Sequence, residues 1–261
     1  MHDLSPVAKT SQFLSVAVAI VFLIVGLVLS FRRGRPHPLL LVSISAASFS
    51  WIEAPYDWAM YAQFPPGLPR LPAWWPLNWT WGGGVPAAVP IGYVSYFVLP
   101  ALVGVALARW LNATFRWRAP ITLLTTGLIV GFLWALFFNG IIGAQMSTFH
   151  YGRVIPGLAL WAGTVHQYPL YDALAMGVQM MVITYLLGRL DSSGRTLIDA
   201  WADSRAKSRL GSSLLSIVAF MAIGNLVYLA VFAPHLATKV LHLQTVAPKE
   251  RLYAGVPNQP L

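Results

Sequence analysis

Apolar residues in this chain fall into six long runs, which short polar or basic segments separate. Each run is close to the roughly 20 residues that a helix needs to cross the ~30 Å hydrocarbon core of a bilayer. The pattern therefore predicts membrane-spanning helices at residues 11–31, 38–61, 89–111, 120–144, 169–190 and 214–234. A seventh apolar stretch, 154–165, is too short to cross and contains Pro156 and two glycines, which favours a re-entrant or interfacial segment.

Composition supports a membrane protein. The chain is 57% hydrophobic and 10% charged, with a mean hydropathy of +0.65, whereas soluble domains carry about 25% charged residues. A water-soluble fold of 261 residues could not cover this much apolar surface. We therefore expect a single integral membrane domain over 1–261, an all-α polytopic bundle of about six transmembrane helices. The chain has no cysteine, so disulfides and thiolate chemistry are excluded.

Basic residues predict the orientation. Eleven lie in the loops on one side, namely Arg32, Arg33, Arg35, Arg109, Arg116, Arg118, Arg189, Arg195, Arg205, Lys207 and Arg209, and six lie on the other. Cytoplasmic loops carry the excess of Lys and Arg, so both termini are expected outside, in a bacterial cytoplasmic membrane. The same placement explains the net charge of +9 without nucleic acid as a partner. The arginines after the first run favour an anchor over a cleaved signal peptide.

Three of the eight acidic residues lie within these runs: Glu53 and Asp57 in the second and Asp172 in the fifth. An ionisable side chain in a membrane span is costly unless it faces a cavity or a partner, and such residues usually mark functional sites. Glu53 lies about 22 Å along its helix, in the outer third of the hydrocarbon layer, and Pro55 is expected to kink that helix. The fifth span runs the other way, so Asp172 reaches the same level. We predict an acidic pocket that opens outward beneath the aromatic, proline-rich loop at 64–81.

Each acid also has a structural interpretation. Glu53 and Asp57 could pair with Arg70 or Arg153, and Asp57 could lie in headgroup water. Asp172 follows a proline at a helix start and could cap that helix. Four other polar side chains are open to the same choice between a structural role and a site role: His150, His166, Asn139 and Asn225.

Acid–base chemistry on an apolar substrate fits these residues best. Metal-ligand clusters with helical spacing and redox cofactor motifs are absent from the sequence, so no metal and no cofactor is expected. Burial raises the pKa of a carboxylic acid and keeps it protonated, which suits a general acid. Nearby aromatic and histidine side chains are the expected substrate contacts: Tyr56, Trp58, Trp79, His166, Tyr168 and Tyr171.

Two stretches resemble the AveC-type spirocyclase family, membrane proteins linked to spiroketal formation in avermectin-like polyketides. The first is Trp-Ile-Glu-Ala-Pro-Tyr-Asp at 51–57, followed by the Trp/Pro-rich loop and Pro-Ile-Gly-Tyr-Val at 90–94. The second is Pro-Gly-Leu-Ala-Leu-Trp-Ala-Gly-Thr-Val-His-Gln-Tyr-Pro-Leu-Tyr-Asp-Ala-Leu at 156–174, followed by Gly177. The chain is shorter than the family's typical members. The resemblance implies a cyclase fold and leaves the substrate open.

If the chemistry follows the family, a keto-diol closes to a spiroketal. Glu53 would act as the general acid, and either Asp172 or Asp57 would stay ionised to stabilise an oxocarbenium-like cation and accept a proton. The expected partners are a small hydrophobic substrate and the membrane. Two alternatives stay open: a membrane terpene cyclase that uses the same acids, and a non-enzymatic lipid-binding or transport protein. Transporters usually show inverted repeats, which are not visible here.

Overall fold

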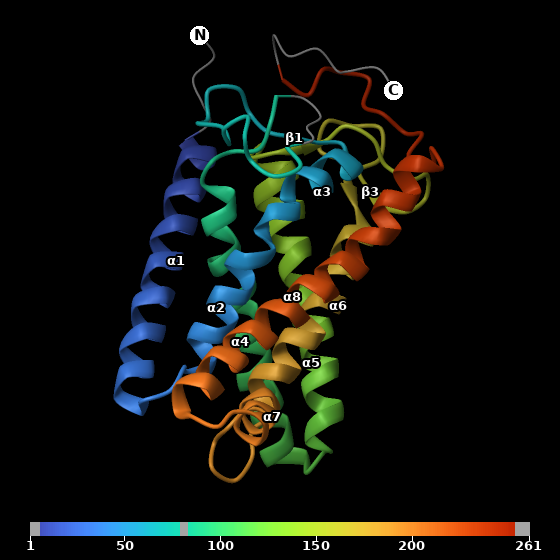
Figure 1. The fold of residues 1–261 in the computed structure, drawn as a ribbon. Helices are drawn as coiled ribbons and strands as arrows, with labels where there is room; N and C mark the ends of the chain where they lie inside the picture. Colours follow the sequence, from blue (N-terminus) through green and yellow to red (C-terminus); the bar gives the residue numbers. More distant parts are fainter. Residues whose placement is uncertain (1–5, 79–82, 254–261) are drawn as a thin grey trace.

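A computed structural model describes residues 6–78 and 83–253. Six long helical segments cross the bundle: α1 (Pro6–Arg33), α2 (Pro38–Phe49) continued by η1 (Ser50–Ile52) and α3 (Glu53–Met60), α4 (Val89–Phe115), α5 (Ala119–Ala135) continued by η2 (Leu136–Gln145), α6 (Leu170–Gly188) and α8 (Arg209–Val240). Each is long and apolar enough to span a membrane, so the predicted all-α membrane bundle is confirmed (Figure 1). The first and last helices extend beyond their predicted ends by several residues.

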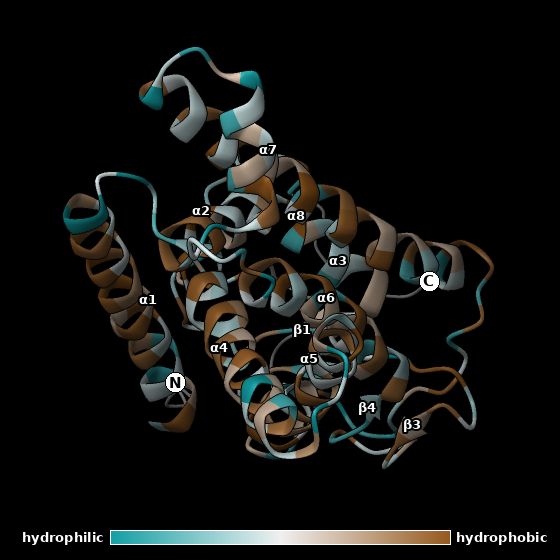
Figure 2. Ribbon diagram, turned by 90° about the horizontal axis from the view of Figure 1, so that it is seen from below, coloured by the Kyte–Doolittle hydropathy of each residue, from teal (hydrophilic) through white to brown (hydrophobic). Residues whose placement is uncertain are grey.

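Apolar side chains cover the outside of the bundle. The hydrophobic residues follow the helices along their length, while polar residues gather at the helix ends and loops (Figure 2). Phe13, Ile24, Leu133 and Leu226 are among the large side chains that are more than half exposed. Such a surface would aggregate in water, and it is the surface that lipid tails solvate.

The described chain begins and finishes at the same end of the bundle, which we call the terminal end (Figure 1). Two short antiparallel pairs tie its loops together: β1 (Ala62–Gln63) with β2 (His150–Tyr151), and β3 (Ala159–Leu160) with β4 (Tyr168–Pro169). The stretch 154–165, expected as a re-entrant or interfacial segment, forms part of the β3–β4 hairpin. That this end faces the outside of the membrane stays a prediction from the distribution of Lys and Arg.

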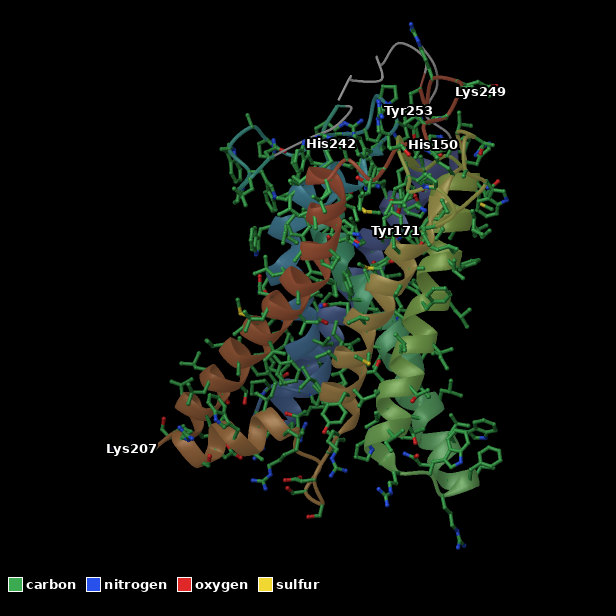
Figure 3. The ribbon with its side chains drawn as sticks, turned by 90° about the vertical axis from the view of Figure 1, so that its right-hand side faces the viewer. His150, Tyr171, Lys207, His242, Lys249 and Tyr253 are labelled. Carbon is green, nitrogen blue, oxygen red and sulfur yellow. The ribbon has the colours of Figure 1, made fainter. Side chains whose placement is uncertain are left out.

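The opposite end, which we call the basic end, carries the arginine-rich loops and a short helix, α7 (Leu197–Arg205). Figure 3 shows Lys207 at this end and His150 and Tyr171 toward the other. The prediction that residues 189–209 form only a basic loop was wrong, because they include this helix. Thr196 and Asp199 form a capping box, and the pattern Thr-x-x-Asp was the sequence signal for this helix start. Backbone and side-chain bonds from Arg195 and Ser193 hold the pKa of Asp191 well below its usual range.

Proline breaks the second span where the acids lie. Pro55 has no N–H, so it cannot continue the ladder of helical hydrogen bonds to the preceding turn. The helix tightens into the 3₁₀ turn η1 and resumes at Glu53 as α3, which ends at Tyr61 with a left-handed φ of 54°. This short helix carries Glu53 and Asp57 on one buried face.

Small residues bring α5 and α6 close together. A Cβ atom at Gly131 would lie 2.4 Å from the Cβ of Met180, and one at Gly127 would lie 2.8 Å from the Met180 carbonyl. Gly177 on α6 makes an equally tight approach to α5 at Leu128. Membrane helices use such residues for close backbone packing. This packing places η2, the continuation of α5, beside the start of α6, where Asp172 lies.

Candidate active site

One cavity of about 130 Å³ lies toward the terminal end of the bundle. Glu53, Asp57 and Asp172 all line it, as the depth of each acid in its span predicted. All three side chains are at least 91% buried. Its other lining residues are mostly aromatic or apolar and include Tyr56, Met60, Phe64, Tyr93, Tyr96, Phe97, Phe138, Phe149, Tyr151, Met176 and Tyr228. The site is thus a cluster of three acids in an apolar, aromatic cavity.

Asp172 accepts four hydrogen bonds. The hydroxyl of Tyr56 donates to Oδ1 at 2.8 Å. Oδ2 accepts from the side-chain amide of Asn139 at 2.9 Å and from the hydroxyls of Tyr151 and Tyr168, each at 3.2 Å. Three of these donors share Oδ2 and one reaches Oδ1, so Oδ1 keeps a lone pair that can accept a further proton or donor. Four segments of the chain (α3, η2, β2 and β4) supply the donors, and their packing holds Asp172 in one orientation.

The π-helix η2 positions Asn139. Its backbone turns are wider than those of an α-helix, and π-helical segments are frequent at functional sites. Asn139 lies in this segment, lines the cavity and donates to Asp172. Asn139 thus combines the structural role and the site role, because its bond joins η2 to α6 and lies at the cavity. Asn225 is a link between helices away from the cavity, since it bonds Trp51 and Ser48.

Glu53 ends a chain of hydroxyl groups. Tyr93 donates to Oε2 of Glu53, and its hydroxyl lies 2.5 Å from that of Tyr228. Because Tyr93 has one proton and donates it to Glu53, Tyr228 must donate to Tyr93. The chain joins α3, α4 and α8. The rings of Phe49 and Tyr56 stack on Tyr228 at 4.9 and 5.6 Å, so the acid lies beside packed aromatic faces.

Asp57 is the least satisfied of the three acids. Its Oδ2 atom is buried and has no hydrogen-bond partner. The salt bridges in the described part of the chain all lie at the basic end, among Arg35, Asp191, Arg195 and Asp203. Within the described residues, neither Glu53 nor Asp57 therefore forms a contact ion pair with Arg70 or Arg153, although the Arg70 charge lies near enough to act on Asp57.

The two arginines have other partners. Arg70 donates to the carbonyls of Phe64, Pro65 and Gly84, and the Arg153 guanidinium lies 5.8 Å from the Tyr61 ring. The capping alternative for Asp172 also fails, since α6 begins without a side-chain cap and the carboxylate faces the four donors described above.

The predicted substrate contacts fall into three groups. Tyr56 lines the cavity. Tyr168 donates a hydrogen bond to Asp172 but is not among the residues that line the cavity. Three other side chains are not among those that line the cavity: Trp58, His166 and Tyr171. Lys239 lies over the Trp58 ring at 4.9 Å, Nδ1 of His166 pairs with the Ala144 carbonyl at 2.8 Å, and Tyr171 packs against His235. Trp79 lies outside the described residues.

Several lining residues were not predicted from the sequence: Tyr93, Tyr151, Tyr228 and Phe149. Tyr93 stands within the motif at 90–94, and its place inside a span was the available signal. Tyr151 comes from a loop strand and Tyr228 from the middle of α8, where nothing in the local sequence distinguishes it from other aromatic residues. His150 is buried near the cavity without lining it, and burial, with His166 nearby, lowers its pKa to about 4.

Fold and site together define a polytopic membrane protein with a buried acidic cavity. The sequence matches the family model described as Spirocyclase AveC-like over residues 31–259. Because this match covers most of the chain, the protein belongs to the AveC-like spirocyclase family, as the motifs around Glu53 and Asp172 indicated. No match was found among curated proteins or among solved structures.

Proposed function

We propose that this protein is a membrane-embedded cyclase and dehydratase that closes a keto-diol, of polyketide type, to a spiroketal by carboxylic acid catalysis without a cofactor. The observation that carries the proposal is the contrast between two acids in one cavity. Asp172 has four hydrogen-bond donors aimed at it, whereas Glu53 has one described donor, Tyr93. Membership of the spirocyclase family supports this class of reaction.

Differences in hydrogen bonding assign the two roles. Hydrogen bonds to the charged form of a group favour that form, so Asp172 is the better candidate for the ionised base. Three carboxylates cannot all be charged in a small apolar cavity without counter-ions, because like charges repel each other at short range. We assign the general acid to Glu53, which lines the cavity beside the aromatic rings of Tyr56, Tyr93 and Tyr228. Asp57, which lacks the donors of Asp172, is not needed as the base.

The reaction then runs in balanced steps. One substrate hydroxyl adds to the ketone and gives a hemiketal. Glu53 protonates the hemiketal hydroxyl, and the bond between that oxygen and its carbon breaks. Water departs, and an oxocarbenium ion remains. The second hydroxyl attacks this carbon and gives its proton to Asp172. One proton has moved from Glu53 to Asp172, and its return resets the site with one water released per turnover.

The aromatic walls suit the cationic intermediate. An aromatic face attracts a cation within about 6 Å of its centre, most strongly where water is excluded. Tyr56, Tyr93 and Tyr228 all line the cavity beside the acids. Their rings would stabilise the oxocarbenium ion more than the neutral hemiketal, which is the preference that lowers a barrier.

Turnover of a cyclisable keto-diol by the purified protein in lipid nanodiscs tests the proposal, with mass spectrometry to follow the loss of water. Glu53→Gln keeps the volume of the side chain but cannot supply a proton, so turnover should fall by about 10²–10⁴-fold. Its yield and thermal stability should change little. Full activity in Glu53→Gln would remove Glu53 from the mechanism. Conversion of a linear isoprenoid, with the keto-diol untouched, would favour a terpene cyclase.

A further inference from the structure

The terminal half of α1 forms one wall of the cavity. Ser11, Gln12 and Ser15 line it, at the terminal end of a helix whose central residues are otherwise almost entirely apolar. No other described segment covers the opposite face of α1, where Phe13 is 75% exposed and Leu14 is 57% exposed. In a membrane this face meets lipid. A single helix therefore stands between the acidic cavity and the lipid on this side of the bundle.

The basic end of α1 is firmly held. Gly26 packs so closely on α2 that an added Cβ would lie 3.0 Å from Leu40 Cα. The Ser30 hydroxyl accepts a bond from the His37 amide at 2.8 Å. Arg33 donates to the Gly194 carbonyl at 2.5 Å, and its own carbonyl accepts from Arg209 at 3.2 Å.

The terminal end of α1 has no comparable attachment. Within the described residues, no hydrogen bond or salt bridge joins residues 6–25 to another segment, and Ser11 bonds only the Ala8 carbonyl of its own helix. Ala8 and Ala19 are buried against the bundle, and Ser15 meets Gly92 of α4. The larger α1 side chains that pack against the core, Phe22, Leu23 and Leu29, lie further toward the basic end. Lipid tails are as apolar as these side chains, so no hydrophobic driving force holds the two helices together here, and van der Waals packing alone does so. The helix is fixed by hydrogen bonds at one end and held by packing alone at the other.

Cavity size requires some part of the wall to move. A volume of about 130 Å³ is close to that of the roughly 150 Å³ engineered cavity that takes up one benzene molecule. A chain with a ketone and two hydroxyls, long enough to close two rings, is larger than benzene. The cavity in this conformation is too small to hold it. Among the lining elements, α1 combines exposure to lipid with weak attachment at the level of the acids.

The family match covers the acids of the cavity but not the wall that α1 forms. It begins at residue 31, after nearly all of α1, and includes Glu53, Tyr93 and Asp172. The wall formed by Ser11, Gln12 and Ser15 thus lies outside the matched residues.

We propose that α1 is a lateral gate, and that an apolar substrate dissolved in the membrane reaches the acids by passing between α1 and α4 at the terminal end. Opening is a swing of the terminal half of α1 about its attachment near Gly26 and Ser30. Ser11, Gln12 and Ser15 then supply polar contacts to the hydroxyl groups of a substrate that has left the lipid. The nature of that substrate rests on the proposed function; the route does not.

A disulfide can lock this gate. A Cβ at Gly92 would lie 3.4 Å from Ser15 Cβ, close to the ~3.5–4.5 Å that a disulfide requires. The chain has no cysteine of its own, so Ser15→Cys with Gly92→Cys gives one defined pair. The matched control is Gly104→Cys with Thr184→Cys, where the Cβ separation is 3.6 Å and the bond ties α4 to α6 away from α1.

Access is measured without relying on catalysis. Dicyclohexylcarbodiimide, which dissolves in lipid, adds to protonated carboxyl groups, and peptide mass spectrometry counts its adducts on Glu53, Asp57 and Asp172. We expect oxidation of the Ser15–Gly92 pair to slow labelling more than about tenfold, because open conformations are typically populated at about 0.1–10% and the disulfide removes them. Reduction should restore the rate in the same protein. The Gly104–Thr184 pair should label equally fast in both states, and a water-soluble carbodiimide should react slowly throughout.

Equal labelling of the oxidised and reduced Ser15–Gly92 protein would overturn the gate. Faster labelling by the water-soluble reagent would overturn the membrane route, since the substrate would then come from the aqueous side. The keto-diol assay on the same samples tests the other proposal separately. Redox-dependent labelling without any keto-diol turnover would keep the gate and refute the spirocyclase reaction.

Discussion

Replacing Asp172 by asparagine tests the center of the site. The change keeps the shape of the side chain but replaces one acceptor oxygen by an amide that donates. The amide keeps the most hydrogen bonds with its oxygen in place of Oδ2, which accepts from Asn139, Tyr151 and Tyr168. The amide nitrogen then replaces Oδ1, and the hydroxyl of Tyr56 loses its acceptor.

The expected magnitudes differ for stability and for turnover. A buried polar group left without a partner costs about 1–3 kcal/mol, so the loss of the Tyr56 acceptor should cost about that much. Tyrosine hydroxyls can rotate and accept from the new amide, which brings the expected loss to the lower part of that range. Turnover should fall by about 10²–10⁴-fold, the usual contribution of a positioned base, because asparagine cannot take the proton from the attacking hydroxyl.

Tyr168→Phe is the matched control. It removes one of the donors to Oδ2 of Asp172 and leaves the carboxylate in place. We expect it to lower thermal stability by about 1 kcal/mol while turnover falls less than about tenfold. Both variants are assayed on a keto-diol in nanodiscs, with thermal unfolding measured on the same preparation. The kcat should carry the loss in Asp172→Asn, because the interaction forms in the transition state.

Two results would refute this reasoning. A folded Asp172→Asn protein with the turnover of the wild type would show that Asp172 is not the base. Equal losses of turnover in Asp172→Asn and Tyr168→Phe, in proportion to their loss of stability, would show that the network of donors is structural.

Three further predictions concern other parts of the molecule. Tyr93→Phe removes the donor to Glu53 and the acceptor of Tyr228; we expect a loss of about 1–3 kcal/mol in unfolding free energy, partly reversed when Tyr228→Phe is added. Gly131→Ala places a Cβ 2.4 Å from that of Met180 and should cost about 1–3 kcal/mol through overpacking, measured by thermal unfolding in detergent. Burial lowers the pKa of His150 from 6.5 to about 4, so the unfolded chain binds the extra proton first and stability should fall as pH falls from 6.5 to 4. His150→Gln should flatten unfolding curves over that pH range, and unchanged acid sensitivity would contradict this assignment.

Much of the fold follows from the sequence because a bilayer restricts what a chain can do. A span needs about 20 apolar residues, so runs such as 89–111 identify helices without any knowledge of packing. The fixed rise of a helix gives the depth of Glu53 and Asp172, and the alternating direction of the spans brings them to one level. Hydropathy detects only long apolar runs, so α7 was not predicted. It lies at the basic end as a short, capped, partly polar helix.

Only the tertiary structure decided what each acid touches. Hydropathy sets where a helix crosses but not its rotation about its own axis, and rotation determines whether Asp57 meets Arg70 or an apolar cavity. The donors to Asp172 come from residues 56, 139, 151 and 168, on four segments that packing alone brings together. Asn139 reaches Asp172 from the π-helical continuation of α5, and the glycines between α5 and α6 let the two backbones come close. The sequence by itself determined that three acids share one layer of a membrane bundle, because hydrophobic length and helix rise act locally along the chain. Contacts between distant segments decided the rest, and those exist only in the folded protein. They give Asp172 four donors, place Glu53 at the end of a chain of tyrosines and leave one oxygen of Asp57 without a partner.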